Sequence, residues 1–68
     1  MPYKFKDIRK RLLKLDYNIV RQSGSHVIFS KNNSNIIVPH HGGKDISLGV
    51  EKKIIKKIGL SAKEFKSL

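Results

Sequence analysis

This sequence of 68 residues has no cysteine, few aromatic side chains and few acidic ones. Without cysteine, it has no disulfide framework, no thiol nucleophile and no cysteine-based zinc site. Its two tyrosines and three phenylalanines are too few to form a stacking platform for single-stranded nucleic acid. No apolar run is long enough to span a bilayer, and the N-terminus lacks the apolar segment of a secretory signal. We therefore expect a cytoplasmic protein.

Basic residues dominate the charge. Fifteen lysines and arginines stand against five aspartates and glutamates, which gives a formal net charge of +10. Such an excess indicates a polyanionic partner, most often nucleic acid, or an acidic protein surface. A membrane surface would also attract this charge, but we do not expect one as the partner.

The length indicates one small domain, residues 1–68. A chain this short buries roughly 60% of the surface that its unfolded form exposes. A core this small cannot enclose a deep pocket, and we therefore expect no cofactor. Shallow chemistry or binding at the surface fits this size better.

Two stretches have the apolar spacing of amphipathic helices. In the first, from about Tyr3 to Leu15, apolar residues recur at steps of three and four, and lysines lie on the opposite face. Asp16 is a plausible end for this helix because aspartate tolerates left-handed backbone. The second helix is predicted to begin after Ser47, a good N-cap residue, and to end at Gly59.

Three strands are predicted between these helices. They are residues 17–22, 26–30 and 36–38, with Pro39 ending the third. Ser23, Gly24 and Ser25 form the first turn, and the polar residues 31–35 form the second connection. Alternation along the first strand puts Ile19 and Arg21 on one face. Such short connections imply an antiparallel meander.

The spacing of Ser61 and Glu64 is that of a capping box, so a last short helix should end near Lys66. The predicted order is helix, three antiparallel strands, helix and short helix. Each long helix has one apolar face, and both can pack on one face of the meander. The fold class is therefore α+β, a two-layer sandwich.

Three segments resemble the HicA (YcfA-like) toxin family. They are Gly24-Ser25-His26 after a strand, Val38-Pro39-His40 at the end of the third strand, and Ile58-Gly59-Leu60-Ser61 followed by Glu64-Phe65. The resemblance implies a fold like that of double-stranded-RNA-binding domains, an mRNA interferase activity and inhibition by a cognate HicB-type antitoxin. It also implies that the family's essential histidine is His26. One departure is Val50-Glu51 after Gly49, where the family commonly has Thr-Leu.

Metal-free cleavage of RNA needs a base for the 2′-hydroxyl proton, an acid for the leaving 5′-oxygen and positive charge near the phosphate. Histidine suits the first two tasks because its ordinary pKa of about 6.5 allows both protonation states near neutrality. Lysine and arginine suit the third. On the resemblance, His26 is the candidate catalytic base, and Arg21 across the turn is a candidate contact to the same phosphate. The alternative is that His26 is an ordinary strand residue that pairs with the backbone or packs against Ile28.

Several other residues are candidate RNA contacts. The full predicted set is Arg21, Gly24, Ser25, His40, Lys6 and Lys10. Lysines on a helix act as point charges on phosphate and carry no base information. Either His40 or His41 could serve as the acid or bind a phosphate, and the resemblance favours His40 as a structural or phosphate contact. A solvated histidine pair is the alternative, and we expect no metal site because adjacent loop residues point different ways.

Two further functions fit the same charge and fold. One is a double-stranded-RNA-binding module without catalysis, which would read shape and 2′-hydroxyls and would not need His26. The other is a basic domain that only recognises an acidic protein. For the nuclease we expect two partners, mRNA and an antitoxin that is acidic at the interface.

Overall fold

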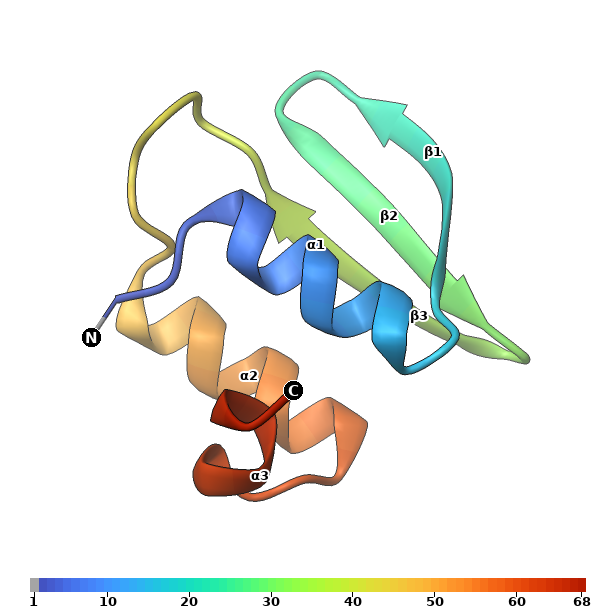
Figure 1. The fold of residues 1–68 in the computed structure, drawn as a ribbon. Coiled ribbons are helices and arrows are strands. Elements are labelled where there is room, and N and C mark those ends of the chain that lie inside the picture. Colours follow the sequence, from blue (N-terminus) through green and yellow to red (C-terminus); the bar gives the residue numbers. More distant parts are fainter. Residues whose placement is uncertain (1) are drawn as a thin grey trace.

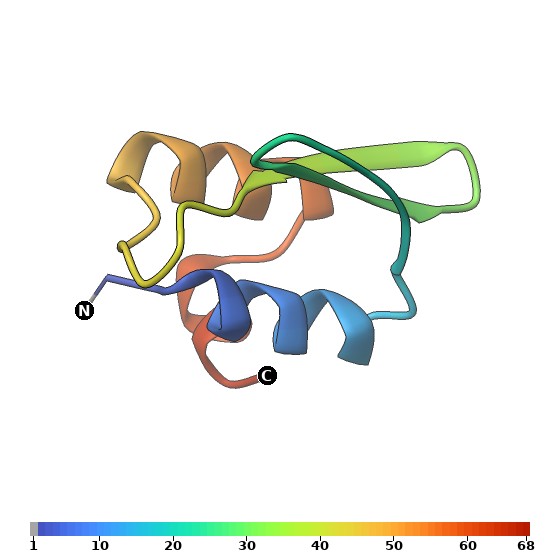
Figure 2. The same cartoon turned by 90° about the horizontal axis from the view of Figure 1, so that it is seen from above.

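The computed structural model describes residues 2–68, and its elements follow the predicted order. They are α1 (Phe5–Lys14), β1 (Asn18–Ser23), β2 (His26–Lys31), β3 (Ser34–Pro39), α2 (Leu48–Ile58) and α3 (Ala62–Lys66). In Figure 1, α1 crosses in front of the strands, and the β1–β2 turn and the loop after β3 lie at the same end of the sheet. In Figure 2, α1 and α3 lie on one side of the sheet, while α2 lies beside β3. The predicted α+β layout is confirmed.

The sheet is an antiparallel meander with strand order β1-β2-β3. Both hairpins have two-residue loops, which begin at Gly24 (φ 58°) and Asn32 (φ 54°). Glycine and asparagine tolerate such positive φ values better than other residues. The predicted second loop, residues 31–35, is too long. Its serine and asparagines have loop composition, yet the ladder continues until Lys31 pairs with Ser34.

A β-bulge interrupts β1. Ile19 pairs with Phe29, but Arg21 pairs with Ile28, so Val20 has no partner opposite it. Residues directly opposite one another share a face of a sheet, and one extra residue reverses the facing of the strand residues beyond it. The prediction that Ile19 and Arg21 share a face is therefore wrong. The bulge turns Arg21 to the face that also carries His26, two residues before Ile28 on β2.

One core joins the helices to the inner face of the sheet. Its members are buried apolar residues from every element except β1, together with Tyr17 and Ile46 from the connections. They are Phe5, Ile8, Leu12, Tyr17, Val27, Phe29, Ile36, Val38, Ile46, Ile54, Ile55 and Phe65. The apolar faces of both long helices meet in this core, as the spacing predicted. None of the helices within residues 2–68 combines the length and the apolar character needed to cross a membrane.

The helix ends follow the predicted signals. Asp16 takes up left-handed backbone (φ 70°) after α1, and Gly59 does so (φ 86°) after α2. The Ser47 hydroxyl accepts a hydrogen bond from the Val50 amide at 3.3 Å. In α3, the Ser61 amide donates to the Glu64 carboxylate at 2.9 Å and the Glu64 amide donates to the Ser61 hydroxyl at 3.1 Å. These bonds complete the capping box that the sequence predicted.

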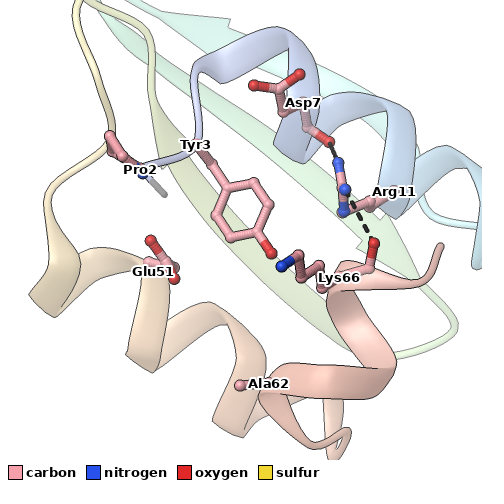
Figure 3. A pocket seen from close by; sticks show the side chains of 7 residues that line it. All are labelled: Pro2, Tyr3, Asp7, Arg11, Glu51, Ala62 and Lys66. Carbon is pink, nitrogen blue, oxygen red and sulfur yellow. Dashed lines mark hydrogen bonds between the residues drawn. The ribbon is translucent and has the colours of Figure 1, made fainter.

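Arg11 fastens α3 to α1. Its Nε donates to the Phe65 carbonyl at 2.9 Å, and its terminal nitrogens donate to the carbonyls of Asp7 at 3.1 Å and Lys66 at 3.2 Å. Figure 3 shows the guanidinium between the Asp7 and Lys66 backbones. Carbonyls at the end of a helix have no partner within it. Arg11 therefore supplies the last turn of α3 with donors from another helix.

Candidate functional site

His26 is the first residue of β2, directly after the Gly24–Ser25 turn, and its side chain is exposed. It pairs with Ser23 on β1 and with Pro39 on β3. Its neighbour Val27 is buried, so His26 belongs to the opposite, outer face of the sheet. The turn is braced because the His40 amide donates to the Ser25 carbonyl at 2.6 Å. The sheet thus holds the backbone of His26 while the imidazole stays open to solvent.

His26 lines a shallow hollow of about 380 Å³, which we call the His26 hollow. The loop after β3 and the first turn of α2 supply its other walls. Its lining residues are His26, Pro39, His41, Lys44, Asp45, Ile46, Ser47 and Val50. The hollow thus brings a second imidazole and a lysine ammonium to the neighbourhood of His26.

Arg21 lies on the outer face of the sheet, two pairing positions along from His26. Its partner Ile28 is two residues after His26 on β2. Strand residues two apart lie on the same face, so both side chains project to one side of the sheet. The predicted proximity of Arg21 to His26 is consistent with this register, which the bulge at Val20 creates.

His40 takes part in a different hollow. Its ring lies flat on the Phe5 ring, with centroids 4.0 Å apart and planes 11° from parallel. It lines a hollow of about 300 Å³ at the start of α1, which we call the α1 hollow. The lining residues are Lys4, Phe5, Lys6, Arg9, His40, Gly42 and Gly43. The structure therefore separates the two adjacent histidines, with His41 beside His26 and His40 beside Lys6.

The remaining predicted contacts are spread along this end of the molecule. Gly24 and Ser25 form the turn next to His26, and the Gln22 side chain donates to the Gly24 carbonyl at 3.3 Å. Lys10 is exposed one turn beyond Lys6 on α1 and lines neither hollow. Lys44 and Arg9 were not among the predicted contacts. No pattern could single them out, because the loop after β3 has no periodicity and Arg9 is one of many basic residues.

One ion pair ties the two hollows together. The Lys4 ammonium donates to the Asp45 carboxylate at 3.0 Å and to the Gly43 carbonyl at 2.9 Å. Lys4 and Asp45 also form a β-bridge, and the Ile46 amide donates to the Tyr3 carbonyl at 2.7 Å. Asp45 is the one carboxylate that lines the His26 hollow, and Lys4 offsets its charge. The groups around His26 are therefore basic on balance and suited to an anion.

A hollow of about 390 Å³ lies elsewhere, between the start of α1, α2 and α3. Figure 3 shows the residues that line it, with Tyr3 near the centre and two carboxylates, Asp7 and Glu51, at its margin. None of the predicted site residues lines it. Its mixed charge is less suited to a polyanion than the two basic hollows. Within residues 2–68, no group of three or more histidine, aspartate or glutamate side chains gathers as a metal site would require.

The fold and these surfaces define a small basic α+β protein with an exposed histidine at a hairpin turn, next to cationic groups. Comparison with known families makes the assignment specific. Residues 5–60 match the family described as the HicA toxin of bacterial toxin-antitoxin systems. The chain belongs to the HicA toxin family, as the Gly-Ser-His segment and its companions indicated.

A curated relative supports the same assignment. A protein of Pseudomonas fluorescens (strain Pf0-1), named probable mRNA interferase HicA, is 32% identical to this chain over 57 residues. The match covers 84% of this chain and 95% of the relative. The similarity thus extends over most of this chain and nearly the whole of the relative.

Proposed function

We propose that this chain is an mRNA interferase, an endoribonuclease that works without metal and uses His26 as its catalytic base. The observation that carries the proposal is the placement of His26, which is exposed on a braced turn beside a second histidine and a lysine. The family and the name of the Pseudomonas relative support a toxin that acts on mRNA. With mRNA as its substrate, it would act in the cytoplasm.

The proposed reaction is a transesterification within the RNA chain. His26 takes the proton of a 2′-hydroxyl, and the oxygen attacks the adjacent phosphorus. The bond from phosphorus to the 5′-oxygen of the next nucleotide breaks, and that oxygen receives a proton from an acid. The products are a 2′,3′-cyclic phosphate and a 5′-hydroxyl. One P–O bond forms and one breaks, and one proton is taken up and one is released.

His41 is the group we assign as the acid, because it lines the same hollow as His26 whereas His40 does not. Lys44 and Arg21 are the cations assigned to the phosphate. They would stabilise the extra negative charge of the five-coordinate phosphorane. Arg21 comes from β1, His26 from β2, and His41 and Lys44 from the loop after β3, so the site exists only in the folded chain.

The second proposed partner is a cognate antitoxin of the HicB type, acidic where it meets the toxin. A net charge of +10 favours fast association with a negative surface. The most economical blocking position is over His26, because it excludes RNA and covers the base together.

A non-catalytic double-stranded-RNA-binding module is the alternative function. The order of one helix, three antiparallel strands and a second helix, together with the basic charge, suits such a module. It would bind RNA through phosphates and 2′-hydroxyls and would have no need of His26.

The deciding experiment incubates end-labelled mRNA with the wild-type protein and with His26→Ala. The proposed nuclease yields fragments with 2′,3′-cyclic phosphate ends, with or without a chelator, and the variant yields none while still binding RNA. Binding without cleavage by both proteins would support the module instead. Activity that a chelator abolishes would contradict the metal-free reaction.

A further inference from the structure

The α1 hollow has a charge that the proposed cleavage step does not use. Three basic residues of the N-terminal segment line it, Lys4, Lys6 and Arg9, together with the imidazole of His40. Lys4 is engaged by Asp45 and by the Gly43 carbonyl. Within residues 2–68, Lys6 and Arg9 form no ion pair. No carboxylate lines this hollow, so the cations of Lys6 and Arg9 face solvent uncompensated.

Several contacts hold the floor of this hollow in place. Phe5 is buried at the start of α1 and carries the stacked ring of His40. The His40 amide is held by the Ser25 carbonyl, and the Lys4 ammonium holds the Gly43 carbonyl. A side chain whose backbone and ring are both fixed loses little entropy when it binds a ligand. The part of the hollow that His40 and Phe5 form is therefore organised before any ligand arrives.

The two basic hollows are neighbours. Pro39 and His41 line the His26 hollow, and His40 between them lines the α1 hollow. Successive Cα atoms lie about 3.8 Å apart, so a single backbone segment separates the two sites. A nucleic-acid strand that places one phosphate at His26 can therefore reach this segment with a neighbouring phosphate.

We propose that the α1 hollow is a second phosphate subsite, in which Lys6, Arg9 and His40 hold a backbone phosphate near the one that is cleaved. This inference rests on the proposed function, because it places the two phosphates on one RNA strand. Arginine can bind two phosphate oxygens at once, while the lysine ammonium and a histidine ring N–H supply further donors. Such contacts set the register of the strand and carry no base preference.

A second phosphate subsite has a consequence for substrate length. A dinucleotide with one phosphodiester occupies only the His26 hollow, whereas a longer RNA occupies both. The affinity that the α1 hollow adds should therefore be seen only with the longer RNA. Loss of the subsite should raise the dissociation constant by about tenfold, the value of a charge-assisted hydrogen bond.

The test variant is Lys6→Ala/Arg9→Ala, and its charge-matched control is Lys14→Ala/Lys63→Ala, at the far end of α1 and on α3. All four side chains are exposed, so circular dichroism should show native folding in both variants. Binding is measured by fluorescence anisotropy with a short 2′-O-methylated RNA, which cannot be cleaved through its 2′-hydroxyls. We expect weaker binding for the test variant only. Its plot of log K against log salt should be shallower by about 0.7, the slope of one phosphate contact on a single strand.

Cleavage gives an independent readout. The test variant should match the wild type on a dinucleotide and fall behind it on the longer RNA through a higher KM. An equal loss of cleavage with both substrates would overturn the proposed subsite. A salt slope no different from that of the control variant would do the same. Unchanged RNA binding with weakened capture of the antitoxin would also overturn it, in favour of a protein contact. If the wild type cuts neither substrate, the proposed nuclease fails, but the anisotropy series still decides whether the hollow binds phosphate.

Discussion

The imidazole of His40 lies flat on the ring of Phe5, with centroids 4.0 Å apart. The same residue bonds through its amide to the Ser25 carbonyl at 2.6 Å. His40 thus connects the start of α1 to the turn that presents His26. Its ring has a structural contact of its own, apart from any contact with phosphate.

These two roles of His40 can be separated by substitution. His40→Ala should lower the free energy of unfolding by about 1 kcal/mol, the typical value of an aromatic pair. It should also weaken RNA binding. His40→Phe keeps a ring for stacking on Phe5 but has no donor, so it should restore stability and not affinity. Urea unfolding and anisotropy measure the two effects, and a full return of RNA affinity in His40→Phe would exclude a phosphate contact.

For His26, substitution by alanine should remove cleavage and leave the fold and RNA binding intact. The side chain is exposed, so its loss makes no cavity in the core. A general base typically contributes a factor of about 10² to 10⁴, and the cleavage rate on labelled RNA should fall at least that far. His41→Ala tests the acid by the same assay. A collapsed circular-dichroism spectrum for His26→Ala would instead make His26 a structural residue.

The bulge in β1 gives a prediction for Arg21. Because Val20 has no partner, Arg21 faces outward with His26. Arg21→Ala should therefore lower kcat/KM for RNA by about tenfold or more, the effect expected when one charge-assisted contact to phosphate is lost. Asn18→Ala, on the same strand but at the opposite end of the sheet from His26, is the control. If both variants are as active as the wild type, Arg21 has no part in the site.

Much of the fold was predictable because local signals agree with the packing. Apolar spacing indicated both long helices, and Asp16, Ser47, Gly59 and Ser61 ended or began helices where their backbone preferences suggest. The bulge at Val20 had no such signal, because it depends on how two strands pair over several residues. The second hairpin loop was overestimated for a related reason, since the serine and asparagines have loop composition yet pair in the ladder.

The site was predictable only in part. The Gly-Ser-His segment indicated His26 through a family resemblance, and the structure places that residue exposed in a basic hollow. Which loop residues surround it depends on how the chain turns after Pro39. Adjacent residues His40 and His41 enter different hollows, and only tertiary structure determines which goes where. Lys44 directly precedes Asp45, whose contact with Lys4 holds this part of the loop beside the site. That contact joins residues 41 positions apart in the sequence.

The capping box of α3 predicts a pH effect. The bonds from Ser61, first from its backbone and then from its side chain, lower the pKa of Glu64. A carboxyl whose pKa is lower in the folded state stabilises the fold above its unfolded pKa, and this stabilisation is lost as pH falls through the folded pKa. Glu64→Gln should therefore be less stable than the wild type at neutral pH, with the difference vanishing in acid. Thermal unfolding across pH measures this, and a difference that stays constant into strong acid would mean that the charge of Glu64 is not its cause.

The last prediction concerns the antitoxin. If inhibition works by covering the site, the complex should bury His26, with carboxylates of the antitoxin near Arg21 and Lys44. Electrostatic steering by this basic surface should make the association rate fall as salt rises. A bound partner should also raise the thermal stability of the toxin. A partner that binds the folded state and not the unfolded one stabilises the folded state by mass action.

Diethyl pyrocarbonate labelling and then mass spectrometry of the toxin, free and in complex, tests this arrangement. His26 is exposed in the free chain and should react there, and the complex should protect it. The Arg21→Ala variant should bind the antitoxin more weakly, while Asn18→Ala should bind as the wild type does. If His26 reacts equally fast in the free toxin and in an inhibited complex, occlusion is wrong. Inhibition would then have to act at a distance, either by holding the loop after Pro39 in another position or by occupying the RNA path through the α1 hollow.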